Sequence, residues 1–228
     1  MPPPIRLIRS TVFDHFCGGV NEVDCLRVVD KMYTKGVSSV LDYSVEGKEE
    51  EAQFDAALNM TLKTIEFARE REAIPFAVFK PTGFGRLALY EKVGDKAHLT
   101  ENEQKEWNRV IERFDIACKT AFEKDVLLLI DAEESWMQDA ADAIVTDMMR
   151  KYNKQKAIVF NTLQMYRWDR LDYLKNLHEQ AKSEGFYIGM KLVRGAYMEK
   201  ENDRATERGL KSPICVSKEA TDINYDAA

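Results

Sequence analysis

The sequence predicts an α/β fold of the (β/α)8 barrel type, truncated after about five strand–helix units. Three observations carry this prediction. Short apolar runs alternate with longer amphipathic stretches along the chain, the runs show little polar alternation, and no hairpin turn joins one run to the next. Continuous apolar runs are typical of strands that are buried on both faces of a parallel sheet. Strands that alternate with helices indicate right-handed βαβ crossovers.

The predicted strands are short and rich in β-branched or large apolar residues, as buried strands usually are. They cover Val37–Asp42, Phe76–Lys80, Val126–Asp131, Ala157–Asn161 and Tyr187–Val193.

The stretches between the strands have the spacing of amphipathic helices. Apolar residues recur there at intervals of three, four or a helical multiple, with charged residues between them, so each helix has one side to bury. The four stripes are Phe54, Leu58, Leu62 and Ile65; Trp107, Val110, Ile111, Phe114 and Ala121; Trp136, Ala140, Ile144 and Met148; and Leu171, Leu174, Leu177 and Ala181.

Helix ends are also marked in the sequence. Thr100 with Glu103 and Ser135 with Gln138 have the spacing of capping boxes, which satisfy free amides at a helix start. Gly185 follows the last stripe, where a left-handed C-terminal cap is common.

Two segments are predicted. Residues 1–36 form an N-terminal helical arm, in which Leu26, Val29 and Met32 could cover the first strand, and residues 37–228 form an incomplete barrel. An open doubly wound sheet is the competing architecture, but it normally has a glycine-rich first turn for phosphate. The turn here, SVEGKEE, has one glycine among acids. A complete barrel needs about 250 residues, so 228 residues with an arm favour a truncated one.

Composition narrows the classes of function. A net charge of −6 without a basic cluster argues against nucleic acid as a partner. The four cysteines are widely spaced and form no CxxC pair, which favours free thiols in a reducing compartment. With only three histidines and no ligand spacing, no metal site is predicted. No apolar run is long enough to span a bilayer, and the first ten residues lack a signal-peptide core.

Polar side chains follow every predicted strand, at the end where barrel enzymes carry their functional residues. In chain order they are Asp42, Lys80, Asp131 with Glu133, Gln164, and Lys191 with Arg194. Any one of them alone is explained by a strand that ends where solvent begins. As a series they suggest that Lys80, Lys191 and Arg194 converge with Asp131 on one rim. Lys80 follows an apolar strand and needs either an anionic ligand or an ion pair with Asp42 or Asp131.

The segment from Lys191 to Tyr197 combines two cations with a Gly195–Ala196 pair. Small residues would let a flat ligand approach the backbone, and cations would stabilise the charge of a reduced flavin. The simpler interpretation is a strand-to-loop turn with solvated charges. From the residues alone, flavin is one of several anionic ligands that this segment would accept.

Other conspicuous residues have structural explanations. Trp107, Trp136 and Trp168 begin helical stripes and are predicted to be core residues. Cys118 is predicted to be inert packing and His178 a surface residue.

Five motifs, in this order along the chain, together resemble the FAD-dependent proline dehydrogenase family. They are FKPTGFG from Phe79, LLLIDAEES from Leu127, TLQMY from Thr162, KLVRGAYMEKE from Lys191 and SKEATDINYDAA from Ser217. The KLVRGAYMEKE run is the most specific, and the resemblance covers roughly Val37 to Ala228.

The resemblance implies a distorted (β/α)8 barrel that binds FAD non-covalently. It implies oxidation of L-proline to 1-pyrroline-5-carboxylate by hydride transfer, with electrons passed to a quinone, and so peripheral contact with a membrane. The implied location is cytoplasmic or at the inner membrane for a bacterial protein and mitochondrial for a eukaryotic one.

The resemblance also implies residue roles. Lys80 would pair with the substrate carboxylate, Asp131 would hold the surrounding cations, and Tyr197 would line the proline pocket. The flavin ring or its chain would contact Gln164, Lys191 and Arg194, with Gly195 and Ala196 giving close backbone approach; Lys218 and Thr221 would meet the ribityl-pyrophosphate or adenosine part.

Two departures from the family pattern stand out. Lys191 and Arg194 exchange the arginine and lysine seen in some relatives, which changes hydrogen-bond geometry. The family's final arginine pair has no counterpart before Ala228, so the chain is expected to be a fragment of a longer enzyme or a truncated product with little activity. A related flavin barrel acting on a folate-like substrate, and a non-catalytic flavin- or partner-binding remnant, are the alternatives.

Overall fold

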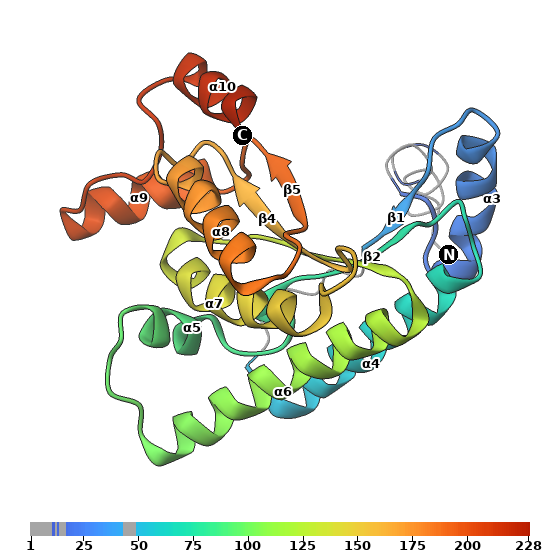
Figure 1. The fold of residues 1–228 in the computed structure, drawn as a ribbon, viewed down its shortest axis with the longest axis horizontal. Helices are drawn as coiled ribbons and strands as arrows, with labels where there is room; N and C mark the ends of the chain where they lie inside the picture. The colour runs from blue at the N-terminus through green and yellow to red at the C-terminus, as the bar shows by residue number, and fades with distance from the viewer. Residues whose placement is uncertain (1–10, 12, 14–16, 43–48) are drawn as a thin grey trace.

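The computed structural model describes residues 11, 13, 17–42 and 49–228. Helix α3 (Glu22–Tyr33) precedes the first strand, and strands then alternate with helices (Figure 1). The strands are β1 (Val40–Leu41), β2 (Phe76–Phe79), β3 (Leu127–Ile130), β4 (Val159–Gln164) and β5 (Met190–Val193). The remaining helices are α4 (Glu51–Arg69), the short 3-10 helix η2 (Pro81–Gly83), α5 (Leu87–Gly94), α6 (Glu101–Lys124), α7 (Ser135–Tyr152), α8 (Arg170–Glu184), α9 (Met198–Arg208) and α10 (Lys218–Ala227).

The order of the strands in space distinguishes the two parallel architectures. The strands form a five-stranded sheet in the order β1-β2-β3-β4-β5, and every neighbouring pair is parallel. A doubly wound sheet reverses its strand order at a switch point, whereas a barrel adds each strand beside the previous one. The unreversed order therefore confirms the barrel type of fold, of which the described strands make an open arc.

The main core lies between the sheet and its helices. Ala77 and Phe79 of β2 and Leu128 and Ile130 of β3 belong to it, whereas Val78, between the first two, is buried outside this cluster. This alternation follows the pleat of a strand, which sends successive side chains to opposite faces. β2 and β3 are thus apolar on both sides, as predicted, whereas β4 and β5 also carry polar residues.

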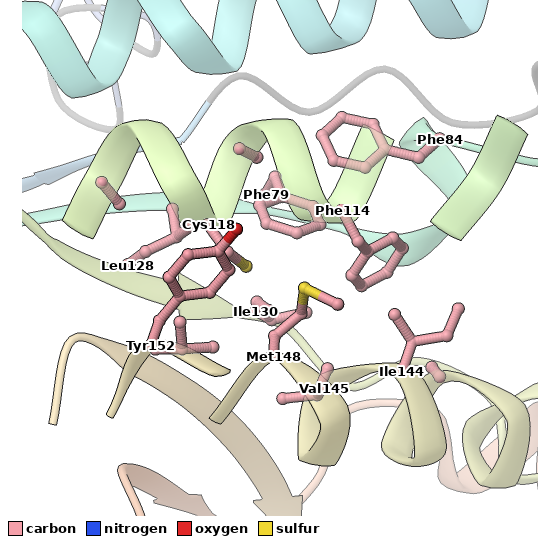
Figure 2. Close-up of a cluster of buried hydrophobic side chains, with 14 of the residues drawn as sticks. Phe79, Phe84, Phe114, Cys118, Leu128, Ile130, Ile144, Val145, Met148 and Tyr152 are labelled. Atoms are coloured by element: carbon pink, nitrogen blue, oxygen red, sulfur yellow. The ribbon is translucent and has the colours of Figure 1, made fainter. Parts of the chain in front are cut away.

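Aromatic packing fixes the helical layer on β2. The ring of Phe79 stacks on that of Phe84 with 4.4 Å between centroids, and both meet Phe114 of α6 edge-on at 5.2 and 5.6 Å. Figure 2 shows these three rings above Ile144 and Met148 of α7. Offset-stacked and edge-to-face pairs are the favoured aromatic geometries, so this cluster holds the rim end of β2 firmly in place.

The predicted helix ends agree with the structure in two cases of three. Thr100 and Glu103 form the capping box of α6, and Gly185 ends α8 with φ 70°. The predicted box at Ser135 is wrong, because Ser135 is already inside α7 and Glu134 is its N-cap residue. The side chain of Gln138 instead accepts from the amide of Glu133, and that of Ser135 donates to Glu201 of α9.

Strand ends and one tryptophan also differ from prediction. β1 has only two residues, Val40 and Leu41, which pair with Phe76 and Ala77 of β2. β4 runs on to Gln164, since the hydroxyl of Thr162 donates to the carbonyl of Ile130 at 2.9 Å and so is satisfied within the sheet. Trp107 is buried as predicted, but Trp168 is 51% exposed, because it precedes α8 in a loop.

Two smaller predictions are confirmed: Cys118 is fully buried and His178 is exposed. Within the described part of the chain, no helix combines the length and the apolar character needed to cross a membrane.

Candidate functional site

The carboxyl ends of the five strands bring most of the predicted site residues to one rim. Asp42, Lys80 and Asp131 directly follow β1, β2 and β3, and Gln164 is the last residue of β4. Lys191 lies within β5, and Arg194 directly follows that strand. Parallel strands end at the same edge of a sheet, which is where barrel enzymes place their reacting groups.

Two lysine–carboxylate pairs form the centre of this rim. The ammonium of Lys80 donates to Oδ2 of Asp42 at 3.2 Å, and the ammonium of Lys191 donates to Oδ1 of Asp131. Burial opposes the charge of Lys80, but Asp42, and at longer range Asp131 and Glu133, raise its pKa overall. Lys80 is therefore a fully charged cation in a partly dry site, where an anion is held more strongly than in water.

Glu133 is a third carboxyl at the rim, and it is buried. Its oxygens accept from the amide of Thr82 at 2.9 Å and from the hydroxyl of Thr82 at 2.7 Å. Burial raises its pKa to about 7 despite these hydrogen bonds. A carboxyl with this pKa exchanges its proton near neutral pH, which is typical of functional sites.

Sequence reasoning placed Glu133 on the rim but gave it no role. The available signal was the run Asp131-Ala132-Glu133-Glu134, since three acids directly after a buried strand cannot all be solvated. The sequence did not show that Thr82, fifty-one residues away, would supply its partner.

The side chain of Gln164 links the segments that follow β3 and β5, the two strands on either side of β4. Its amide nitrogen donates to the carbonyl of Glu133 at 2.7 Å, and its oxygen accepts from the amide of Ala196 at 2.9 Å. Gln164 is buried, so these bonds are shielded from water. One N–H and one lone pair of the amide group are not used by any residue that the structure describes, so a cofactor could use them. The contact of Gln164 with a cofactor stays a prediction.

Gly195 is required by its neighbour Tyr166 as well as by its backbone. Its φ of 139° lies in the region that favours glycine, and a Cβ at this position would lie 2.3 Å from Cδ1 of Tyr166. The amide of Tyr166 donates to the carbonyl of Arg194 at 2.7 Å, so the chain after β4 supports the turn after β5. The structure thus adds a reason for glycine that differs from the approach of a flat ligand.

Arg194 lies in a second charged group, which also contains Lys218. Nε of Arg194 donates to Oδ1 of Asp222 at 2.6 Å, and Nζ of Lys218 donates to Oδ2 of the same residue at 2.5 Å. The guanidinium also stands 4.5 Å from the ring centroid of Tyr225. Lys80 and Lys191 thus pair with carboxylates that follow strands, Asp42 and Asp131, whereas Arg194 pairs with Asp222 of α10.

The remaining predicted residues lie around these two groups. Tyr197 precedes α9 as its N-cap residue, with the ammonium of Lys200 5.4 Å from its ring centroid. Thr221 is buried in α10 and donates its hydroxyl to the carbonyl of Ser217 at 3.2 Å. Among the described residues, no group of acidic, histidine and cysteine side chains is arranged to hold a metal ion.

The donors of this rim fit a dinucleotide that carries a polar ring and a pyrophosphate. Lys218 is the first residue of α10, where Ser217 caps the helix, and Arg194 reaches Asp222 one turn further along. Cations beside a helix N-terminus suit a phosphate group. The turn at Gly195 and Ala196 directly follows β5, and the ammonium of Lys191, which lies within β5, donates to Asp131.

Comparison with known proteins gives a consistent result. The family model described as proline dehydrogenase matches residues 25–228. The carbapenem antibiotics biosynthesis protein CarD of Pectobacterium carotovorum subsp. carotovorum is 37% identical over 219 residues, covering 96% of this chain and 57% of that protein. The mitochondrial proline dehydrogenase 1 of Drosophila melanogaster is 42% identical over 129 residues, covering 57% of this chain and 19% of that protein.

A solved structure supports the fold independently. Proline utilization A (PutA) from Bdellovibrio bacteriovorus, inactivated by N-propargylglycine, superposes with a TM-score of 0.83 at 18% identity, covering 98% of this chain and 24% of that one. This chain spans about half the length, or less, of the curated relatives that it matches.

Proposed function

The chain belongs to the proline dehydrogenase family. We propose that it forms the part of an enzyme that binds the flavin and supplies two lysines of the active site, and that this enzyme oxidises L-proline to 1-pyrroline-5-carboxylate. The observation that carries the proposal is the pair of lysines, Lys80 and Lys191, held by Asp42 and Asp131 at the carboxyl ends of the strands. Bound FAD would accept the hydride that leaves the proline carbon next to nitrogen.

Lys80 binds the substrate carboxylate in this proposal. Its ammonium is already positioned by Asp42, and its charge is reinforced by Asp131 and Glu133. The Asp42 side chain is 39% exposed, so it can turn toward solvent when a carboxylate replaces it. The exchange leaves one ion pair in place of another, and the lysine is never left unpaired.

Lys191, Gln164 and the turn at Gly195–Ala196 orient the flavin ring. Asp131 fixes the ammonium of Lys191, and Gln164 fixes the turn through the amide of Ala196. A cation beside the ring favours the charge that forms on reduction, and residues that are already held in place need no reorganisation during the reaction. Tyr197, which directly follows this turn, lines the proline pocket.

Arg194, Lys218 and Thr221 bind the remainder of the cofactor. The two cations share Asp222, so a pyrophosphate would take over donors that this single carboxylate now holds. Electrons then pass to a quinone, and the enzyme meets the membrane at its surface. The matched eukaryotic relatives are named as mitochondrial, and a mitochondrial or bacterial inner membrane would supply that acceptor.

The absorbance spectrum of the purified protein tests the proposal. A bound flavin that bleaches when L-proline is added without oxygen is the expected result. A flavin that bleaches with a reduced folate but not with L-proline would identify a different substrate class. A flavin that proline leaves unchanged would indicate a binding protein, and a protein that takes up no added FAD would contradict the whole assignment.

A further inference from the structure

A cavity lies at the side of the sheet, between α3, β1 and α4, with Asp42 of the rim among the residues that line it. Its volume is about 660 Å³, and the residues around it are largely apolar, among them Val29, Met32, Met60 and Phe67. Two of the chain's four thiols, those of Cys17 and Cys25, line this one cavity. The proposed oxidation of proline uses neither of them.

The Gly18–Gly19 pair folds the chain back onto the first turn of α3. A Cβ on Gly19 would lie 2.6 Å from Cβ of Asp24 and 2.7 Å from the amide nitrogen of Cys25. Real Cβ atoms do not approach backbone so closely, because the contact is well inside the sum of the van der Waals radii. Only glycine at position 19 therefore lets the segment lie on Asp24 and Cys25.

The turn at Gly18 and Gly19 places the backbone of Gly18 against the sulfur of Cys25. A Cβ on Gly18 would lie 3.3 Å from Sγ of Cys25 and 4.0 Å from its Cα. A disulfide needs Cα atoms about 4.4–6.8 Å apart. Cys17 is directly bonded to Gly18 and is exposed outside any helix or strand, so its backbone is close enough to Cys25 for the two Cα atoms to meet this requirement after a local shift.

We propose that Cys17 and Cys25 are a modification site, at which a reversible intramolecular disulfide fastens residues 17–20 to α3. The oxidant is a small-molecule disulfide, for which oxidised glutathione serves as the probe. The thiolate of Cys17 attacks one sulfur of the probe and releases the first glutathione thiolate. The thiolate of Cys25 then attacks the mixed disulfide at Cys17 and releases the second, so the two electrons lost by the protein reduce one probe molecule to two thiols.

The environments of the two thiols determine this order. Cys17 is exposed and accessible to a dissolved disulfide, whereas Cys25 is half-buried. Burial, with help from Asp24 and Glu22, raises the pKa of Cys25, which makes it the slower first nucleophile. Once Cys17 carries the mixed disulfide, proximity compensates for the small thiolate fraction of Cys25.

Peptide mass spectrometry of the protein in glutathione buffers tests the proposal. Trypsin releases residues 10–27 as one peptide that holds both cysteines and no others. We expect this peptide to lose about 2 Da on oxidation, for the two hydrogens of one disulfide, while Cys118 and Cys215 stay reduced. The Cys25→Ser variant should instead carry one glutathione on Cys17. The Cys17→Ser variant should form no disulfide, and its Cys25 should take up glutathione more slowly than Cys17 does in Cys25→Ser.

Several results would overturn the proposal. One is a wild-type peptide that carries glutathione on both cysteines, and another is a protein dimer linked through Cys17. A third is a wild-type peptide that stays reduced in the same buffer in which Cys17 of the Cys25→Ser variant becomes modified.

A second pair of variants tests the geometry itself. Gly19→Ala should shift the thiol–disulfide equilibrium at least about tenfold toward the dithiol, because its Cβ pushes the segment off α3. Val20→Ala, in the same exposed segment, should match wild type. An unchanged equilibrium in Gly19→Ala would overturn the role assigned to the glycine turn, and the two serine variants decide the proposal even if Gly19→Ala fails to fold.

Discussion

Individual side chains at the rim have two different kinds of explanation. An ion that follows an apolar strand needs a partner, which left Asp42 and Asp131 as candidates for Lys80, and the structure contains the pair with Asp42. Gly195 and Glu133 were not fully predictable. The neighbour of the first is Tyr166 and the partner of the second is Thr82, and both contacts depend on how separate βα units pack.

Glu133 should make stability fall as pH rises toward neutral. Its pKa is about 7 in the folded protein against 4.5 ordinarily, so between these values the folded state keeps a proton that the unfolded state has lost. The free energy of unfolding therefore decreases across that window, by up to about 3 kcal/mol, and levels off above it. Urea unfolding at several pH values measures this slope.

The matched variants are Glu133→Gln and Glu123→Gln. The first removes the titrating group from the buried site, so the decrease in the free energy of unfolding across the window should be smaller by that amount. The second removes a carboxyl whose side chain is 59% exposed and should leave the slope unchanged. Equal slopes in wild type and Glu133→Gln would show that Glu133 ionises normally in the folded protein.

At the scale of elements, the link between α9 and α7 decides how the loop after β5 is held. Glu201 of α9 is buried and accepts from the amide and the hydroxyl of Ser135, both at 2.6 Å. It thus caps the first turn of α7 from another helix. The sequence pattern at Ser135 suggested a cap from within α7, because local spacing cannot reveal a carboxylate that arrives sixty-six residues later.

Removing this carboxylate should loosen both helices. Glu201→Ala leaves the buried amide of Ser135 without an acceptor, and the loss of charged hydrogen bonds should lower the free energy of unfolding by about 3 kcal/mol. Hydrogen exchange should become faster at the start of α7 and in α9.

Glu199→Ala is the control, since Glu199 lies in the same first turn of α9 but is exposed. Glu201→Gln, which keeps an acceptor for the amide, should fall between the two. If Glu201→Ala proved no less stable than Glu199→Ala, the helix α9 would not depend on this contact.

At the scale of the whole molecule, the sequence predicts the architecture more accurately than it predicts where each strand and helix begins and ends. The alternation of apolar runs and helical stripes predicted a parallel sheet, and the strand order β1 to β5 confirms the barrel type (Figure 1). β4 is longer than predicted at its C-terminal end, because Gln164 still pairs with Val193 of β5, whereas β1 is shorter than predicted. Helices α5 and α9 were not predicted, since neither has a long apolar stripe.

In the candidate site too, the positions along the chain can be predicted from the sequence, but the contacts between distant segments cannot. The strand ends located its residues, and the resemblance supplied their roles. The separation of Arg194 and Lys218 from the lysine–carboxylate pairs depends on α10, whose Asp222 draws both cations toward it. Such a grouping is a property of the packed molecule, which a one-dimensional pattern does not contain.

The role of Lys80 can be measured as the concentration of L-proline that half-bleaches the flavin without oxygen in the variants Lys80→Met and Asp42→Asn. Loss of a charged hydrogen bond to the carboxylate should raise that concentration about 10- to 100-fold in Lys80→Met, with flavin binding retained. Asp42→Asn removes the competitor for Lys80 and should leave the concentration equal or lower. A Lys80→Met protein that retains wild-type sensitivity to proline would show that Lys80 does not bind the substrate carboxylate.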